Sequence, residues 1–511
     1  MTATPIQIGI ESQLFIDDRF VNQIEDLTRV VNPPVKAGPV DIAPQPTGMV
    51  SIVEHQGTFY MYGRCNEEAG EIGMNVALST DGLRWRPADR TSFGPGRNVA
   101  VPGVDSGGVC LDPTDPEYPF KGLFDIRREE YWPVESGTAG DVLPTGHTQA
   151  CARGGLYLFR SVDGLQWELV PGLPVPSLCD TQNQLIYDPR LRRFVAYLRA
   201  FPMLGGPHNE KRCVVRTEIE DLSHFPWPSR ANPENKPSGH HQYPYIHDEM
   251  PIVLADDCAD PPGTDLYNPA MELYEGVYLA FPSMYRCYGY SGENVSLGRD
   301  MRGNWSNGGL FETHIAVSRD GLRFTRYRTP YLASGLIDDH LGFSGDPDCG
   351  LIMMGVGMLQ RGDEIWQYYY GTQRVHGMTK EFEGHRSNQH GVFRAVQRRD
   401  GFVSMDAGHS GGELTTPVLQ FAGDRLTLNA ACHGLGEVWV EIQDPEGRPL
   451  PGFGMDDAVS IDRNGIRQEI WWRQGPDLQV LAGCPVRLRI RLRSAKLYAF
   501  RFTRSVEGEP T

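Results

Sequence analysis

The sequence predicts an all-β protein in which a five-bladed β-propeller, residues 1–403, is followed by a β-sandwich, residues 404–511. Three observations predict this fold: a turn phrase that recurs five times, a hairpin pattern before each copy, and a different strand pattern after the last copy. The 58 glycines and 39 prolines favour many turns and short strands over long helices. A chain of 511 residues is also too long for one ordinary core, so at least two domains are expected.

The turn phrase reads Ser-x-Asp-Gly-Leu-x-aromatic. Three full copies and then two weaker ones occur at residues 79–85, 161–167, 318–324, 221–227 and 398–402. Asp-Gly favours a tight turn because both residues tolerate positive φ. A turn that returns at intervals of tens of residues indicates a repeated β-unit, which buries its apolar faces against its neighbours as propeller blades do. Unrelated surface hairpins that share a common turn are the alternative.

The stretch before each turn phrase contains an apolar strand, a turn and an aromatic-rich strand, which is the pattern of a hairpin. These five stretches are residues 48–64, 107–126, 183–199, 270–281 and 350–370. The early segment Leu14–Val21 is also predicted to be a strand, and we expect it to complete the last blade and so remove an exposed edge. The stretch 228–260, rich in Pro, His and Asp, is interpreted as an elaborated loop.

The pattern changes after about residue 404, where alternating strands occur without a turn phrase. These strands are residues 426–429, 438–443, 468–472 and 486–492. Short alternating strands joined by turns are typical of a separate β-sandwich. Its tryptophans, Trp439, Trp471 and Trp472, are predicted to be core residues rather than ligand contacts.

Charge and cysteine content narrow the function classes. The 65 acidic and 48 basic residues give a net charge of −17, which opposes binding to nucleic acid or to anionic membranes. The sequence has no long apolar run and no basic, apolar start of the signal-peptide kind. The ten cysteines include no Cys-x-x-Cys pair, so reduced thiols and a cytoplasmic location are expected. The motifs of serine hydrolases, P-loop NTPases and dinucleotide-binding enzymes do not occur in a convincing context, so these three classes are disfavoured.

Acidic residues recur where the innermost strand of a predicted blade should begin, and in a propeller these positions surround a central funnel. The candidate catalytic residues are Asp105, Asp180, Asp265 and Asp348, with Glu272 as a possible proton donor within a strand. Carboxylates that converge in a partly dry funnel separate their pKa values by repulsion and desolvation. The result is one acid and one base or nucleophile, which is the pair that cleaves a glycosidic bond. Aspartates that merely cap turns and strand ends are the alternative.

Four further residues are candidates for substrate binding: Arg64, Arg199, His376 and Tyr267. Arginine binds carboxylates or sugar hydroxyl groups, and histidine can replace a carboxylic acid as proton donor. Hydrogen bonds between blades are the alternative role for each. No metal ligand or cofactor is predicted, and only a structural calcium ion is left open. Two clusters do not match a zinc motif: His240, His241, His247 and Asp248, and Asp339, His340, Asp346 and Asp348.

This layout resembles the glycoside hydrolases that include invertases, levanases and arabinanases. The phrase D-G-F-V-S at 400–404, leading into a segment that ends L-Y-A-F-R-F at 497–502, is also similar to bacterial proteins described only as glycosyl-hydrolase-like. The invertase signatures W-M-N-D-P-N-G, R-D-P and E-C are missing, and residues 111–113 and 187–189 are only partial echoes. The resemblance therefore implies a site in the funnel that uses acidic pairs, but no individual catalytic role. The sialidase Asp-box is excluded because it separates Asp from Gly by one residue.

The function expected from these observations is a glycoside hydrolase that cleaves a small oligosaccharide or glycoside. A furanoside substrate is implied by the resemblance alone. One alternative is a glycoside phosphorylase working inside cells, with phosphate bound by Arg64, Arg199, Arg374 or His376. The other is a non-catalytic, carbohydrate-binding propeller. The sequence leaves open the sugar, the anomeric outcome and the oligomeric state.

Overall fold

The computed structural model divides into two compact units that we describe separately. The propeller unit comprises residues 35–359 and 366–396, and the C-terminal unit comprises residues 1–34, 360–365 and 397–511. The structure describes residues 4–66, 72–88, 98–128, 130–132, 156–175, 181–200, 212–225, 227, 230–231, 244–245, 250–261, 264–287, 309–338, 345–376 and 389–505. Within these residues the helices are two short turns, Asp18–Phe20 and Gln479–Leu481, and neither could cross a membrane.

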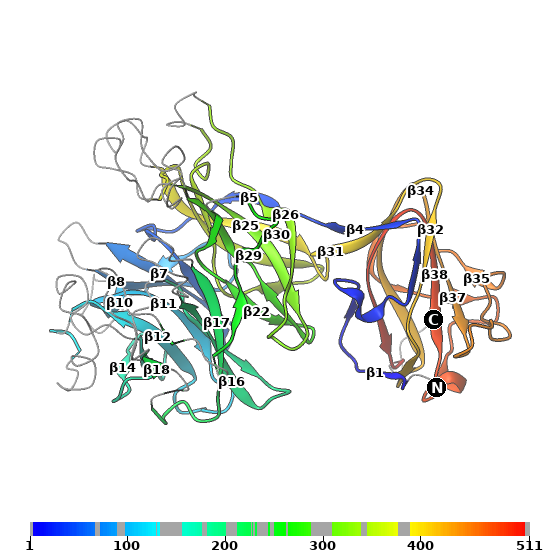
Figure 1. Ribbon diagram of the computed structural model, residues 1–511, viewed down its shortest axis with the longest axis horizontal. Coiled ribbons are helices and arrows are strands. Elements are labelled where there is room, and N and C mark those ends of the chain that lie inside the picture. Colours follow the sequence, from blue (N-terminus) through cyan, green and yellow to red (C-terminus); the bar gives the residue numbers. More distant parts are fainter. Residues whose placement is uncertain are drawn as a thin grey trace. The chain divides into compact units, whose positions relative to one another are not determined.

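Five antiparallel sheets form the blades of the propeller, as the sequence predicts, and Figure 1 labels several of their strands. Blade 1 contains β6 (Val50–His55), β7 (Thr58–Asn66), β8 (Ile72–Ser79), β9 (Arg86–Pro87) and β10 (Val99–Pro102). Blade 2 contains β11 (Val104–Leu111), β12 (Phe120–Ile126), β13 (Leu156–Ser161) and β14 (Glu168–Leu169). Blade 3 contains β15 (Gln184–Asp188), β16 (Arg193–Ala200), β17 (Cys213–Ile219) and β20 (Ile252–Leu254).

The last two blades carry additional strands. Blade 4 contains β21 (Thr264–Leu266), β22 (Met271–Tyr274), β23 (Val277–Ala280), β24 (Ser283–Cys287), β25 (Gly309–Ser318) and β26 (Thr325–Leu332). Blade 5 contains β27 (Leu351–Met354), β28 (Leu359–Arg361), β29 (Glu364–Thr372), β30 (His390–Arg398) and β5 (Val35–Pro39). A separate two-stranded sheet, β18 (Arg230–Ala231) with β19 (Pro244–Tyr245), lies in the stretch that we interpreted as an elaborated loop.

The innermost strands of the five blades form a closed ring. Strand β6 contacts β11, β11 contacts β15, and β15 contacts β22. From blade 4 to blade 5 the contact is a hydrogen bond from the backbone N–H of Gly357 to the Glu272 carboxylate. From blade 5 to blade 1 it is a parallel bridge between Val356 and Ser51. The blades therefore follow one another around a common axis in chain order.

Strand β5 closes the ring as the outermost strand of blade 5. It runs antiparallel to β30, with Val35 opposite Val396 and Lys36 opposite Ala395. Our placement of Leu14–Val21 in this position is wrong. Within that segment Leu14 belongs to β2 and pairs with Ala499 of the C-terminal unit, while Phe15 and Phe20 are fully buried in the core of that unit.

Each full turn phrase is closed by its own side chains. In the copy that begins at Ser161, the serine Oγ accepts a hydrogen bond from the Gly164 N–H at 2.9 Å. The Asp163 carboxylate accepts hydrogen bonds from the next two backbone N–H groups, at 2.8 and 2.9 Å. The Trp167 indole N–H donates back to the Gly164 carbonyl at 3.3 Å. The copies at 79–85 and 318–324 repeat the serine and aspartate bonds.

The glycine of each full turn phrase also joins its blade to the preceding one. The glycine carbonyl accepts a hydrogen bond from a tyrosine hydroxyl in the second strand of the preceding blade. The three pairs are Tyr62 with Gly164 at 2.7 Å, Tyr197 with Gly321 at 3.1 Å, and Tyr368 with Gly82 at 2.5 Å. The turn of blade 3, at 221–227, has no glycine. The strand register of blade 2 places Leu123 where blade 1 has Tyr62. The recurring phrase is therefore a connection between blades as well as a turn.

The C-terminal unit is built around one long sheet in the order β3-β32-β38-β31-β4, with β2, β34 and β36 joined to it. Its strands are β1 (Ile6–Ile8), β2 (Gln13–Leu14), β3 (Gln23–Glu25), β4 (Leu27–Val31), β31 (Val403–Ala407), β32 (Gly412–Thr415), β33 (Leu419–Phe421), β34 (Arg425–Gln443), β35 (Ala458–Val459), β36 (Gly465–Glu469), β37 (Trp471–Trp472) and β38 (Arg487–Thr503). Trp472 is buried in its core, whereas Trp471 is 42% exposed and Trp439 is partly exposed. The sandwich architecture stays a prediction. The expected boundary at 403/404 differs from the observed division, because residues 6–31 pair with strands that follow residue 403.

Candidate functional site

A layer of buried amide side chains crosses the propeller axis. The Gln182 side-chain amide donates to the carbonyl of Val50 at 2.8 Å and to the Ser51 hydroxyl at 3.0 Å. Asn268 donates to the Gln182 side-chain oxygen and to the carbonyl of Met354, both at 3.3 Å. Since buried amides are costly unless they are hydrogen-bonded, this amide layer ties four of the inner strands to one another.

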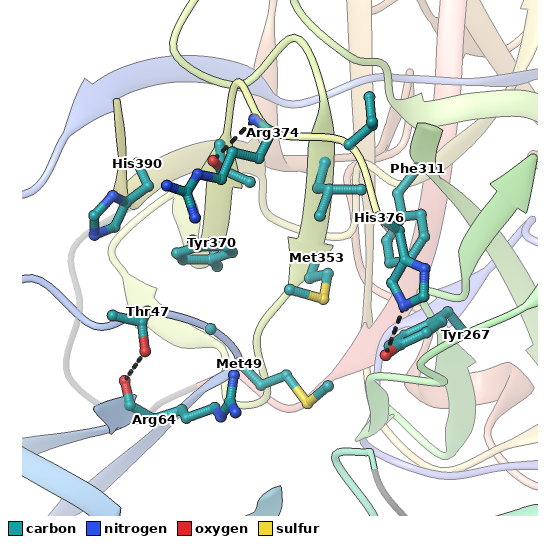
Figure 2. Close-up of a pocket in the computed structure, with 14 residues that line it drawn as sticks. Thr47, Met49, Arg64, Tyr267, Phe311, Met353, Tyr370, Arg374, His376 and His390 are labelled. Carbon is teal, nitrogen blue, oxygen red and sulfur yellow. Dashed lines mark hydrogen bonds between the residues drawn. The ribbon is translucent and has the colours of Figure 1, made fainter. Parts of the chain in front are cut away.

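A cavity of about 480 Å³ lies at the start of the inner strands. Tyr267, Met49 and Met353 line it, and each directly precedes a residue of the amide layer or its partners. The amide layer therefore forms its floor. Blades 1, 4 and 5 supply the lining that Figure 2 shows: Thr47, Gly48, Met49, Arg64, Tyr267, Phe311, Leu351, Met353, Tyr370, Thr372, Arg374, Val375, His376 and His390.

One wall of the cavity is a cluster of rings around His376. The imidazole nitrogens lie 3.3 Å from the Tyr267 hydroxyl and 3.1 Å from the Tyr285 hydroxyl. The ring lies nearly parallel to Phe311, with 5.8 Å between ring centroids. Backbone hydrogen bonds in both directions between His376 and Gly309 fix this segment to β25. The imidazole is thus oriented by contacts on several sides.

The opposite wall carries Arg64, which strand β7 brings to the cavity. Its guanidinium is ion-paired with Asp105, whose other carboxylate oxygen lies 3.0 Å from Arg127. Arg127 also contacts the fully buried Asp125 at 2.9 Å. Asp105 itself keeps 19% of its side chain exposed. This chain of alternating charges holds Arg64 in place.

A third wall comes from the end of β29 and the start of β30. Burial raises the pKa of Tyr370 to about 12, although the Thr372 hydroxyl and the guanidinium groups of Arg374 and Arg64 act in the opposite direction. Two guanidinium groups therefore act on one phenol. The His390 ring lies 6.2 Å from the Tyr370 ring, between centroids. Figure 2 shows Arg374 above and Arg64 below the open space, with the Tyr370 ring at a height between them.

The candidate acids lie at different distances from this cavity. Asp105 contacts a lining residue, as described above. Asp265 is buried, where it accepts hydrogen bonds from the backbone N–H and the guanidinium of Arg212, at 2.5 and 2.8 Å. Asp348 is also buried and is bound by Lys36 at 2.7 Å and by the Tyr369 hydroxyl at 2.9 Å. Asp180 falls outside the described residues.

Glu272 lies on the far side of the amide layer. The chain reaches it after Tyr267, which lines the cavity, and Asn268, which belongs to the amide layer. Its carboxylate accepts the backbone N–H of Gly357, and burial raises its pKa from 4.5 to about 7. The described part of the cavity lining contains no carboxylate.

Three of the four predicted binding residues, Arg64, Tyr267 and His376, come together in the cavity lining. Arg199 lies behind it, where its buried guanidinium stacks 4.2 Å from the Tyr267 ring centroid and donates to the Tyr267 carbonyl at 2.7 Å. Arg199 thus supports Tyr267 from below. Phe311, Tyr370 and His390 were not predicted from the sequence. The run of three tyrosines that ends at Tyr370 was the one available signal for them.

The metal candidates receive little support from the described residues, which contain no group of three or more possible ligands. The histidines at 240, 241 and 247, Asp248, Asp339 and His340 all lie outside the described ranges. Asp346 binds the backbone N–H of Leu336 at 2.8 Å.

No protein-family model and no curated protein matches this chain. Among solved structures, a thermostable family-43 glycoside hydrolase shares 11% identity at a TM-score of 0.39, over 72% of this chain and 96% of the other. An arabinoxylan arabinofuranohydrolase of the same family from Bacillus subtilis shares 10% identity at a TM-score of 0.32, over 91% and 97%. An exo-β-1,3-galactanase from Phanerochaete chrysosporium shares 11% at 0.35, over 93% and 99%. At these values the likeness does not bear on activity, and the propeller assignment rests on this chain's own sheet topology.

Proposed function

We propose that this protein is a glycoside hydrolase that binds a small oligosaccharide or glycoside in the axial cavity, with a furanoside as the narrower form of the proposal. The observation that carries it is the cavity itself. Its volume of about 480 Å³ lies within the range of small-molecule sites. Its walls combine aromatic rings, which cover the apolar faces of sugars, with hydrogen-bonding groups that can orient hydroxyl groups.

For the catalytic pair we propose Asp105 and Asp180. Asp105 contacts the lining residue Arg64 and is partly exposed. Asp180 directly precedes Thr181, whose hydroxyl donates to the Tyr267 carbonyl at 3.2 Å. Hydrolysis needs one carboxyl group to protonate the leaving oxygen and a second to activate water or attack the sugar. His376, held among the rings, is the alternative proton donor.

The test is a screen of aryl glycosides and short fructo-, arabino- and galacto-oligosaccharides, with and without phosphate. On a confirmed substrate, Asp105→Asn and Asp180→Asn should each lower kcat by about 100-fold or more, because acid–base groups contribute at least that much. Asp41→Asn is the matched control, since Asp41 is exposed and its backbone forms a bridge with Arg84 in the turn phrase of blade 1. Full activity in both variants would contradict the proposed pair.

A glycoside phosphorylase is the second candidate, and the pair Arg64 and Arg374 favours it, because guanidinium groups bind phosphate well. Turnover only in the presence of phosphate would identify this activity. Saturable glycan binding without any product would instead support a carbohydrate-binding propeller.

A further inference from the structure

The axial cavity is lined by basic side chains, although the protein as a whole is acidic. The chain carries a net charge of −17. The described lining of the cavity contains two arginines and two histidines, Arg64, Arg374, His376 and His390, and no aspartate or glutamate. The two guanidinium groups are charged hydrogen-bond donors that suit an anion, and they line the cavity although Asp105 pairs with one of them.

The basic side chains are not distributed evenly around the cavity. Arg64 and Arg374 both act on the Tyr370 phenol, and His390 lies beside the same ring. A hydrogen bond of 3.1 Å from the Arg374 backbone N–H to the Thr372 hydroxyl anchors the segment that carries Arg374. Across the cavity lie Tyr267, Phe311 and His376 (Figure 2). The cavity thus has a cationic side and an aromatic side.

We propose that the cationic side is an oxyanion subsite formed by Arg64 and Arg374, and that the aromatic side holds a sugar ring. The oxyanion is either the carboxylate of an acidic sugar or inorganic phosphate, since the planar guanidinium fork fits both. This inference rests on the proposed function and makes it more specific: the substrate is an acidic glycoside, or phosphate is a second ligand. The Asp105 carboxylate holds the Arg64 guanidinium at its Nε, and the Arg64 side chain keeps 31% of its surface exposed.

The experiment is calorimetric titration of the full chain with galacturonate and glucuronate, with galactose and glucose as neutral counterparts, and with inorganic phosphate. We expect an acidic sugar to bind at least about tenfold more tightly than its neutral counterpart, or phosphate to bind saturably, because a charged hydrogen bond contributes that much. Arg374→Gln should lower the affinity for the anion about tenfold or more. Arg86→Gln, an exposed arginine of the outer strand β9, should leave it unchanged.

The outcomes separate the two anion sources. Preference for an acidic sugar without phosphate binding identifies the carboxylate, and phosphate binding without that preference identifies phosphate. If the wild-type protein binds acidic and neutral sugars equally and does not bind phosphate, the inference is overturned. This result does not depend on whether the variant folds. Retained anion binding in a folded Arg374→Gln variant overturns it as well. Because these titrations need no turnover, anion binding without hydrolysis would contradict only the proposed activity.

Discussion

The hydroxyl group of Tyr62 makes a single described hydrogen bond, to the Gly164 carbonyl in the next blade. We expect Tyr62→Phe to lower the free energy of unfolding by about 1 kcal/mol, because the ring packing is kept and one buried hydrogen bond is lost. Chemical denaturation measures this. Tyr187→Phe is the matched control, since the structure gives the partly exposed Tyr187 hydroxyl no described hydrogen bond, and it should change stability little. Equal effects in the two variants would contradict the connecting role of Tyr62.

Glu272 makes the stability of the propeller unit depend on pH. Burial raises its pKa from 4.5 to about 7, so between these values the folded chain holds a proton that the unfolded chain releases. The free energy of unfolding should therefore fall as pH rises from 4.5 to 7 and then stay constant. The total decrease is at most about 3 kcal/mol, and solvent contact at this partly exposed side chain makes it smaller. Glu272→Gln removes the titration. Denaturation of both proteins at pH 5 and pH 8 should show the variant gaining relative stability at pH 8, and an unchanged difference would refute this.

At the residue scale the sequence predicted part of the cavity. Arg64 and His376 were recognisable because each ends or follows an aromatic strand that had to lie near the axis. The acids were predicted less well. Asp265 lies at the start of an inner strand and Asp348 shortly before one, but their carboxylates bind Arg212 and Lys36. No local pattern reveals partners that lie 53 and 312 residues away. His390 could not be found, since it enters the cavity only through the pairing of β30 in blade 5.

Among the structural elements, a glycine of a turn phrase can be compared with a glycine of an ordinary hairpin turn that has the same backbone conformation. Gly321 has φ +71° and Gly276 has φ +73°. A Cβ at Gly321 would lie 2.6 Å from the Tyr197 hydroxyl, whereas at Gly276 the nearest atom is 4.0 Å away. Gly276→Ala should cost about 1 kcal/mol for the backbone alone, and Gly321→Ala about 2–4 kcal/mol, because the contact between blades is also broken. Denaturation curves of the two variants test this, and equal losses would show that the contact contributes nothing.

The hairpins and turns could be predicted because their signals are local, whereas the ring-closing strand could not. Residues 35–39 read Val-Lys-Ala-Gly-Pro, are mostly exposed, and lack the alternation of a typical strand. Leu14–Val21 has a stronger strand pattern, but its apolar side chains are buried in the other unit. The segment that fills the edge of blade 5 is selected by pairing with a strand several hundred residues away. The composition of the two segments does not reveal this pairing.

At the scale of the whole molecule, the two units determine where the chain can be cut to give a stable fragment. The fragment 1–403 would keep β1 to β4 but lose all their described strand partners except Val403, and it would expose Phe15 and Phe20. The fragment 35–396 keeps β5 together with β30 as far as Val396. We expect the second fragment to be monomeric with one cooperative unfolding transition, and the first to aggregate, because unpaired edges and exposed apolar groups associate. Size-exclusion chromatography would contradict this division if 1–403 were the better-behaved fragment.

The seam between β5 and β30 also has a consequence for how the molecule is made. Val35 pairs with Val396, so the ribosome adds 361 residues between the two halves of the seam. At roughly 5–20 residues per second, the first half waits for roughly 20–70 s before the second exists. During that time the earlier blades can form, but the circle stays open, and a strand from a neighbouring nascent chain on the same messenger could occupy the vacant edge. Ribosome spacing and the speed of synthesis would then influence how many molecules close on themselves and how many exchange strands.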